Sequence, residues 1–308
     1  IKYDSAGEIQ WARVIGGTNY EYVHAVAETQ NGDYIVAGYY GSATVNFGNG
    51  ITLKNNNSWD GMLAKYAKTE FPTPSVIQAK AIGGVDSDTV SAVTATSDGG
   101  YIVGGEFSSN NIDLGNGVSL SNNGQKDGII IKAAVNGEIE WVQKIGGVSD
   151  EYIRSVIETN DGGYIVGGYF SSGKIDLGNG NVLVNNRAGN NAGMVIKYDS
   201  NGLVQWSKAI EGTTNNMYIY SAIETNDGGC IVGGYFNSLA IDLENGISLD
   251  NKGARDGMVI KYGPNQEVQW SKVIGGTSDD RIKFVIQSKD GGFLVAVNFQ
   301  SSDIELEN

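Results

Sequence analysis

A fivefold internal repetition is the feature that most constrains how this chain can fold. A Gly-Gly step occurs at positions 16, 83, 146 and 275, and Glu211-Gly212 stands at the equivalent place in a fourth copy. The spacing of about 65 residues runs through the whole chain and leaves no room for a separate domain or a linker. We therefore expect one domain over residues 1–308, with repeats that begin near 11, 78, 141, 206 and 270.

Each copy has the pattern of four short strands. The first ends at the glycine pair, as in Trp270–Ile274, and the second is apolar at every other residue, as in Ile153–Glu158. The third follows an Asp-Gly turn, as in Tyr164–Phe170, and the fourth resembles Gly257–Tyr262. Asp-Gly between apolar runs favours a hairpin. No segment has a sustained 3.6-residue period, so we expect almost no helix.

The connection between the third and fourth strands is long and carries its own hairpin. In one copy this hairpin is Ile241–Leu249, and its turn is an Asn-Gly step. Equivalent steps are Asn49-Gly50, Asn116-Gly117 and Asn179-Gly180. Asn-Gly suits a type I′ turn, which favours a small additional β-ribbon on each repeat.

Four antiparallel strands in each of several repeats are typical of propeller blades. Radial stacking buries both faces of each sheet and leaves only short edges. The sequence therefore predicts an all-β fold, a five-bladed β-propeller of four-stranded antiparallel blades. We expect the first strand to be innermost and its aromatic column to pack between blades. That column is Trp11, Gln78, Trp141, Trp206 and Trp270, and its interruption at Gln78 predicts a local irregularity after Lys68.

The two chain ends are complementary in this scheme. The chain starts within a fourth strand, Ile1–Tyr3, and stops in a ribbon turn at Asn308. We expect Ile1–Tyr3 to pair with the third strand of the last repeat, near Leu294–Phe299. Residues 1–10 would thereby complete the last blade and close the ring. An end within a turn also suggests a fragment of a longer protein.

Composition excludes several classes of function. The net charge of −14 argues against nucleic-acid binding, and no apolar run is long enough for membrane insertion. Cys230 is the only cysteine and His24 the only histidine, so neither a disulfide nor a multi-histidine metal site can form within the chain. Serine or cysteine nucleophile chemistry would need His24, which has no partner motif. We expect no enzyme activity and no cofactor.

A column of acids precedes the second strands. It comprises Glu21, Asp88, Glu151 and Asp280, with Asn216 in the fourth copy. Oxygen-rich loops can bind calcium, so Asp88, Asp150, Glu151 and Asp280 are candidate calcium ligands. The alternative is a carboxylate that accepts backbone N–H bonds or pairs with a lysine. The structural role is favoured because no loop has the alternating aspartate spacing of a dedicated calcium loop.

Two basic columns also recur. The first is complete and comprises Lys2, Lys65, Lys132, Lys197 and Lys261. It predicts one ion pair per blade, with Asp60, Asp127 and Asp256 as the nearby acids. The second comprises Arg13, Lys80, Gln143, Lys208 and Lys272. On an innermost strand it would form a basic ring at the axis or pair with the acid column of a neighbouring blade.

Residues that break the repeat are the better candidates for a binding site. Glu106 stands where other copies have Tyr39, Tyr169, Tyr235 and Asn298. Trp59 is the only tryptophan outside the aromatic column, and it follows an Asn-rich loop. The ligand-binding candidates are therefore Trp59, Tyr39, Glu106, Tyr169 and Tyr235. The structural alternatives are that Glu106 is a surface substitution and that Trp59 covers the ribbon.

The repeat resembles the bacterial β-propeller repeats of the SBBP type over essentially the whole chain. The shared pattern is Gly275-Gly276, Asp280 and Asp290-Gly291, with Asp256-Gly257 and Lys261 one copy earlier. The resemblance implies a propeller fold and an exported, often surface-associated bacterial protein, without a specific activity.

The leading hypothesis is a non-catalytic extracellular propeller that acts as a scaffold or as an adhesion and interaction module. One alternative is a lectin with repeated carbohydrate sites, and another is a glycoside hydrolase that uses two carboxylates. A protein or glycan partner is expected on the face that carries the long connections, because long loops on a rigid scaffold commonly carry binding.

Overall fold

The computed structural model describes residues 1–56, 58–68, 74–115 and 117–306. The predicted all-β fold is confirmed: among these residues the only helical segment is a 3₁₀ turn, Glu244–Gly246. No helix in the described ranges is long and apolar enough to cross a membrane. Asn57, Asn116, Asn308 and part of the connection after Lys68 lie outside the described residues. The chain divides into two compact units, residues 1–142 and 143–308, which are considered separately.

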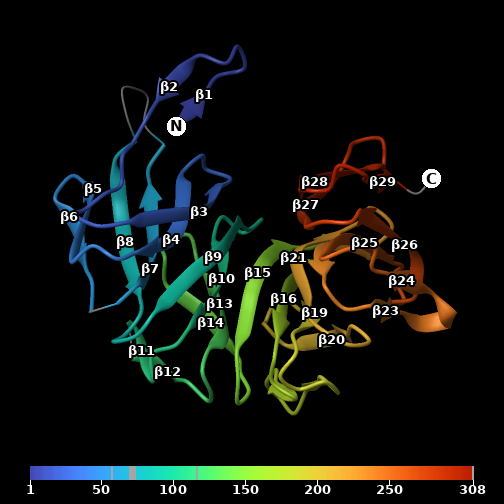
Figure 1. Ribbon diagram of the computed structural model, residues 1–308. Coiled ribbons are helices and arrows are strands. Elements are labelled where there is room, and N and C mark those ends of the chain that lie inside the picture. Colours follow the sequence, from blue (N-terminus) through green and yellow to red (C-terminus); the bar gives the residue numbers. More distant parts are fainter. Residues whose placement is uncertain (57, 69–73, 116, 307–308) are drawn as a thin grey trace. The chain divides into compact units, whose positions relative to one another are not determined.

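The first unit contains two four-stranded antiparallel sheets (Figure 1). One has the order β3 (Glu21–Glu28), β4 (Tyr34–Tyr40), β7 (Asp60–Tyr66) and β8 (Val76–Ile82). The other has the order β9 (Asp88–Ala95), β10 (Tyr101–Phe107), β13 (Asp127–Ala133) and β14 (Ile139–Ile145). Three hairpins complete the unit: β1 (Lys2–Tyr3) with β2 (Ile9–Trp11), β5 (Thr44–Gly48) with β6 (Ile51–Lys54), and β11 (Asn111–Gly115) with β12 (Val118–Ser121).

The second unit repeats this arrangement. Its first sheet has the order β15 (Glu151–Glu158), β16 (Tyr164–Phe170), β19 (Ala192–Tyr198) and β20 (Val204–Ile210). The next has the order β21 (Met217–Glu224), β22 (Cys230–Phe236), β25 (Asp256–Tyr262), β26 (Val268–Gly275) and β29 (Glu305–Leu306). The remaining pairs are β17 (Lys174–Asp176) with β18 (Val182–Val184), β23 (Ala240–Asp242) with β24 (Ser248–Asp250), and β27 (Asp280–Gln287) with β28 (Phe293–Phe299).

The predicted Asn-Gly ribbons are present. The described turns have positive φ at both central residues: 52° and 77° at Asn49-Gly50, and 53° and 80° at Asn179-Gly180. These angles match the type I′ turn that Asn-Gly favours. The ribbons pack along the outer strands of the sheets, with β6 on β8, β18 on β20 and β24 on β26.

The boundary of each sheet differs from the boundary of the sequence repeat. A sheet combines the second, third and fourth strands of one repeat with the first strand of the next, as the pairs Lys65↔Gln78 and Lys197↔Trp206 show. Neighbouring sheets approach each other through the second strands, β9 on β3 and β4, and β21 on β15 and β16. The expectation that the first strand is innermost is therefore wrong.

Small residues on the third strand permit this close approach. A Cβ at Gly167 would lie 2.8 Å from the Cβ of Ala222 and 3.3 Å from Cγ2 of Ile219, both on the next sheet. Trp206 packs against a core cluster that contains Val195 from one sheet and Val232 from the other. The predicted packing of this indole between sheets is confirmed, although Trp206 itself is only partly buried.

The second basic column faces the outer side of the sheets, because its strand is an outer strand. Arg13 donates to the carbonyl oxygen of Pro74 at 2.8 Å, and Gln143 donates to that of Gly202 at 2.8 Å. Lys208 pairs with Glu244 beside the ribbon at 2.6 Å. For these residues, both predicted arrangements, a basic ring at the axis and pairs with the acid column, are wrong.

Four lysines of the first column form ion pairs, but with acids other than the predicted ones, and Lys2 instead donates to the Tyr34 hydroxyl. Lys132 pairs with Asp98 at 2.7 Å, Lys197 with Asp161 at 2.7 Å, and Lys261 with Asp227 at 2.9 Å. These acids belong to the Asp-Gly turns. The predicted partners Asp60, Asp127 and Asp256 begin the fourth strands, and five residues of extended chain place them roughly 16 Å from the lysines.

The first strand of the chain pairs within its own unit. β1 pairs with β2 through Lys2↔Trp11 and Tyr3↔Ile9. Among the described strands, β28 pairs with β27 alone. The pairing of Ile1–Tyr3 with Leu294–Phe299 is not observed, so closure of a five-bladed ring stays a prediction.

Candidate functional site

Every second strand contains a β-bulge at the same place. In each strand pair the register skips one residue of the second strand, between Val23 and Ala25, between Ile153 and Ser155, and at the corresponding places in the other copies. The five bulged residues are His24, Ser91, Arg154, Tyr220 and Lys283. Bulges redirect side chains and are over-represented beside functional sites.

A glycine on the facing strand accommodates the bulge in four copies. A Cβ at Gly168 would lie 2.0 Å from the carbonyl oxygen of Tyr152, and one at Gly234 would lie 1.8 Å from that of Tyr218. Gly38 and Gly105 have equally close contacts. At these four positions a Cβ would meet the carbonyl oxygen of the facing strand, so glycine permits the close approach of the two backbones.

The two faces of the bulged segment differ in how they vary among copies. The residues on either side of the interface between sheets stay apolar: Val23, Val90, Ile153, Ile219 and Ile282 occupy one position. The bulged residue is different in every copy, and the residue two positions earlier is Tyr, Thr, Tyr, Tyr or Arg. The apolar face serves packing in every repeat, whereas the other face has diversified.

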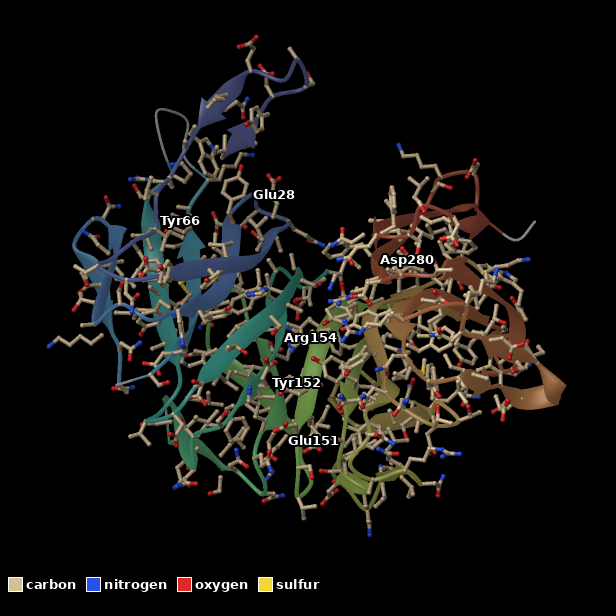
Figure 2. The ribbon with its side chains drawn as sticks, in the orientation of Figure 1. Glu28, Tyr66, Glu151, Tyr152, Arg154 and Asp280 are labelled. Carbon is tan, nitrogen blue, oxygen red and sulfur yellow. The ribbon has the colours of Figure 1, made fainter. Side chains whose placement is uncertain are left out.

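In the second unit the diversified side chains form one contiguous cluster, the tyrosine–cation cluster. It comprises Tyr152, Arg154, Tyr169, Tyr218, Tyr220, Tyr235, Arg281 and Lys283. Ring centroids are 4.8 Å apart for Tyr152 and Tyr169, and 4.9 Å apart for Tyr169 and Tyr218. They are 4.7 Å apart for Tyr218 and Tyr235. Figure 2 shows Tyr152 and Arg154 on β15, next to the acid-column residue Glu151.

Three cations lie over the tyrosine rings. The guanidinium carbon of Arg154 is 4.8 Å from the ring centroid of Tyr152, and that of Arg281 is 5.1 Å from Tyr235. The Lys283 ammonium is 4.0 Å from the Tyr220 ring centroid. Cation–π contacts at such distances hold the charged groups in place without neutralising them. Burial, together with a hydrogen bond to Tyr220, raises the pKa of Tyr235, which therefore stays protonated and neutral.

One carboxylate balances part of this charge. Asp279 accepts a 2.9 Å bond from Arg255 and also pairs with Arg281, so two guanidinium groups share one acid. The hydrogen bond to Asp279 raises the pKa of Arg281, which keeps its charge. The cluster is therefore locally positive in a chain whose net charge is −14.

The first unit has a smaller aromatic group at the same level of its sheets. Tyr22 and Tyr39 are 4.9 Å apart, and His24 stacks on Tyr39 at 5.1 Å. Trp59 lies 5.3 Å from Tyr39, and its ring covers Gly41, where a Cβ would meet it at 2.9 Å. On the second sheet of this unit, Ser91 donates to the buried Glu106 at 3.3 Å.

The carboxylates of the acid column accept hydrogen bonds from backbone N–H groups. Asp88 accepts N–H bonds from Gly84 at 2.7 Å and Ser108 at 2.9 Å, and Glu151 accepts one from Gly147 at 2.7 Å. Asp280 repeats the arrangement with Gly276 at 2.9 Å. Burial raises the pKa of Asp88 despite these bonds, whereas in Asp280 the bonds outweigh burial and lower it.

The surroundings of the candidate calcium ligands do not favour a bound cation. The carboxylates of Asp88 and Asp280 each accept four hydrogen bonds, so their oxygens have little capacity left for a cation. Within the described ranges, no group of three His, Cys, Asp or Glu side chains is placed to hold a metal ion. The fourth candidate, Asp150, receives a backbone contact from Ser171, whose hydroxyl accepts from its N–H at 3.1 Å.

The ligand-binding candidates from the sequence fall within these groups. Tyr169 and Tyr235 lie in the tyrosine–cation cluster, and Tyr39 lies beside Trp59. Glu106 occupies the equivalent place on its own sheet. Sequence reasoning considered the third strand and Trp59 of the long connection, and it missed the facing residues Tyr152, Tyr218, Arg281 and Lys283. Their signal was available, because the second strand diversifies at alternate positions while its apolar positions stay constant.

No protein-family model and no curated protein matches this chain. One solved structure, a protein of unknown function from Bacteroides caccae, aligns with 82% of this chain and 82% of its own at 11% identity and a TM-score of 0.35. That likeness is too weak to support an inference about fold or function.

Proposed function

We propose that the chain closes into a five-bladed β-propeller whose axis is lined by the bulged second strands, and that this ring is a non-catalytic binding module. In this arrangement β27 and β28 join β1 and β2 in the fifth blade. The support is the fourfold recurrence of one sheet plan, in which second strands approach each other wherever neighbouring sheets lie in the same unit.

Two uncovered apolar faces support closure. Val90 and Val93 are buried against the neighbouring sheet, but the equivalent residues of the first sheet, Val23 and Val26, are 55% and 66% exposed. A cavity of about 630 Å³ opens over this face, and Val23, Val26 and Tyr34 contribute to its lining.

The last hairpin carries the complementary face. Phe284, Ile286 and Leu294 are 65%, 55% and 60% exposed. Large exposed apolar patches of this kind mark a packing or binding surface. The hairpin β27–β28 of the same chain is the occupant that we propose for the face of the first sheet.

A lysine supports the same closure. Lys2 belongs to the column that pairs with turn aspartates, yet here it donates to the Tyr34 hydroxyl at 2.6 Å. The Asp290 turn has the same internal bonds as the other turns, including one from the Gly292 N–H at 3.0 Å. In the closed ring Lys2 would form an ion pair with Asp290, as Lys261 does with Asp227.

A double-mutant cycle tests closure. Lys2→Met, Asp290→Asn and the double variant should show a coupling free energy of the same sign as the matched cycle with Lys261→Met and Asp227→Asn. Additive effects at Lys2 and Asp290, beside a clear coupling in the control cycle, would contradict the ring. Val26→Asp provides a second measurement, because a buried unpaired carboxylate should lower the unfolding free energy by about 3 kcal/mol.

The function of the module is inferred from the bulged strands. One observation carries it: a repeated bulge presents a different polar, aromatic or charged residue in each copy, on a scaffold whose apolar positions do not change. Rigid scaffolds with diversified side chains at one place commonly bind partners there. We propose an interaction or adhesion module displayed outside a bacterial cell, in keeping with the resemblance to exported propeller repeats and with the single cysteine.

A binding screen tests the function and its location. Immobilised glycans and candidate surface proteins are offered to the wild type and to a Tyr152→Leu/Tyr218→Leu variant. The matched control is Asn160→Ser/Asn226→Ser, which changes exposed residues at the Asp-Gly turns. We expect binding that the tyrosine variant loses and the control retains. Binding lost only in the control, or no binding at all, would contradict the proposal.

Carbohydrate binding is the favoured form of this function. Stacked tyrosines with partly exposed rings offer both flat apolar faces and phenolic hydroxyls, which together suit a pyranose ring. The stoichiometry distinguishes the alternatives: a lectin with repeated sites binds several glycans per chain, and a single diversified site binds one.

A further inference from the structure

We propose that the tyrosine–cation cluster of the second unit binds a sugar that bears a carboxylate. This inference rests on the proposed binding function and specifies its ligand. The anionic group would lie between Arg281 and Lys283, and the sugar ring would lie against the exposed parts of the Tyr218 and Tyr220 rings.

The positive charge is the first support. Asp279 is shared by Arg255 and Arg281, which leaves one positive charge in excess. Among the described residues no carboxylate lies within 4.0 Å of the Lys283 ammonium, whose partners are the rings of Tyr220 and Tyr235 at 4.0 and 5.7 Å. Lysine and arginine held in this way favour an anion that completes their hydrogen bonding.

The aromatic surface is the second support and indicates a sugar. Tyr169 and Tyr235 are 8% and 6% exposed and serve as the base of the cluster, while Tyr152, Tyr218 and Tyr220 are only partly buried. Tyr220 and Lys283 are bulged residues on β21 and β27 of adjacent sheets, and the Lys283 ammonium lies 4.0 Å from the Tyr220 ring centroid. Tyrosine rings with free edges provide stacking and hydroxyl contacts together.

The overall charge limits the size of the ligand. A net charge of −14 repels an extended polyanion, whereas a local excess of cations attracts a single acidic group. The cluster is therefore suited to a short acidic glycan or the acidic end of a chain, and not to nucleic acid or a highly sulfated polymer.

Titration calorimetry with matched ligands tests the inference. The probes are trigalacturonic acid and sialyllactose, and their neutral counterparts are the trigalacturonate methyl ester and lactose. We expect at least one acidic probe to bind with one site per chain, about tenfold more tightly than its neutral counterpart, because its carboxylate adds a charge-assisted hydrogen bond; tenfold corresponds to about 1.4 kcal/mol. Which probe binds distinguishes a uronic acid from a sialic acid.

Two lysine variants localise the site. Lys283→Gln should weaken binding of the acidic probe about tenfold, and Lys283→Arg should restore most of it. The control is Lys289→Gln, which removes an exposed lysine from the turn of the same hairpin and should leave affinity unchanged. Circular dichroism of each variant verifies that the fold is retained.

The possible outcomes separate this inference from the function on which it depends. Equal binding of acidic and neutral probes, or binding insensitive to Lys283→Gln, overturns the acidic-sugar inference. If the screen still finds a partner that the tyrosine variant loses, the binding module stands. If neither probes nor screen show binding, both proposals are overturned.

Discussion

The two ends of each sheet differ in how much their residues vary among the five copies. At the turn end, Thr, Asp and Lys recur as one network: Thr159 donates to Asp161 at 2.6 Å while Lys197 contacts both residues at 2.7 Å. At the bulge end, the bulged residue is a histidine, serine, arginine, tyrosine or lysine, depending on the copy. A feature that every sheet requires is kept in every copy, whereas a feature that serves one ligand need not be. The turn end therefore stabilises the fold, and the bulge end provides the candidate site.

The core between the two ends sets the scale for this comparison. Trp206→Ala should lower the unfolding free energy by about 3 kcal/mol, because the indole packs against a cluster formed by two sheets. Chemical denaturation measures the loss, and Trp206→Phe should recover part of it. An unchanged midpoint would show that the indole does not contribute to the core.

The turn end should come next in effect on stability. Lys197→Met removes a buried ammonium that bonds Thr159, Asp161 and the carbonyl oxygen of Tyr198, and should cost about 2 kcal/mol. Because Asp161 is about half exposed, water can solvate it in the variant, which keeps the cost below that of a fully buried pair. Lys174→Met, at an exposed ribbon residue, should have no comparable effect. If both variants lost the same unfolding free energy, the ion-pair network at the turn would not be a specific source of stability.

The same network predicts a dependence on pH. Burial raises the pKa of Asp161, but bonds from Lys197, Thr159 and the Gly163 N–H outweigh it and lower the pKa to about 2. The depressed pKa means that Asp161 stabilises the fold above pH 4, and that this contribution disappears as the pH falls towards 2. Solvent screening limits the contribution to about 1 kcal/mol. In Asp161→Asn, unfolding free energy should fall less steeply over this range; an unchanged slope would contradict the assignment.

The sequence predicted the repeat and its strands well because hydrophobic alternation and turn residues are local signals. Partners across the sheet were harder to predict. The lysine column predicted an ion pair for each lysine, which four of the five form, but it did not identify the acid. Within a repeat, both the acid that begins the fourth strand and the acid of the Asp-Gly turn were candidates. The choice depends on direction along the strand, and only the register Ile102↔Lys132 settles it.

The network at the turn has a different set of residues in the first copy. Asn31 stands where the other turns have aspartate, and Asp33 follows two residues later. Asn31 takes the hydrogen bond from Thr29, and Asp33 takes the ion pair with Lys65 at 3.2 Å. The two roles of one aspartate are divided between neighbouring residues, which a column-by-column comparison does not reveal.

The sequence predicted the third-strand residues of the candidate site but not the second-strand residues. The reason is that the sequence of a single copy does not show where a β-bulge lies. Alternation places Tyr152 and Arg154 on one face, but the bulge at Arg154 shifts the register of the residues that follow. Only the facing glycine, Gly168, indicates that two backbones approach closely there. Comparison of the five copies supplies the missing information, since the bulged position varies where its neighbours do not.

The smallest effect on stability should come from the bulge end of the first unit. Trp59 is partly exposed, and its contacts are the edge-on ring of Tyr39, the ring of Tyr22 and the backbone at Gly41. Aromatic pairs of this kind contribute about 1 kcal/mol, so Trp59→Ala should cost no more than that, against about 3 kcal/mol for Trp206→Ala. Its effect on binding should be larger, because an indole at the end of a long connection offers a stacking surface to a partner. Denaturation and the binding screen measure the two quantities on the same variant, with Trp59→Phe as the control that keeps an aromatic ring. A loss of stability equal to that of Trp206→Ala would place Trp59 in the core, and unchanged binding would restrict the partner surface to the other diversified residues.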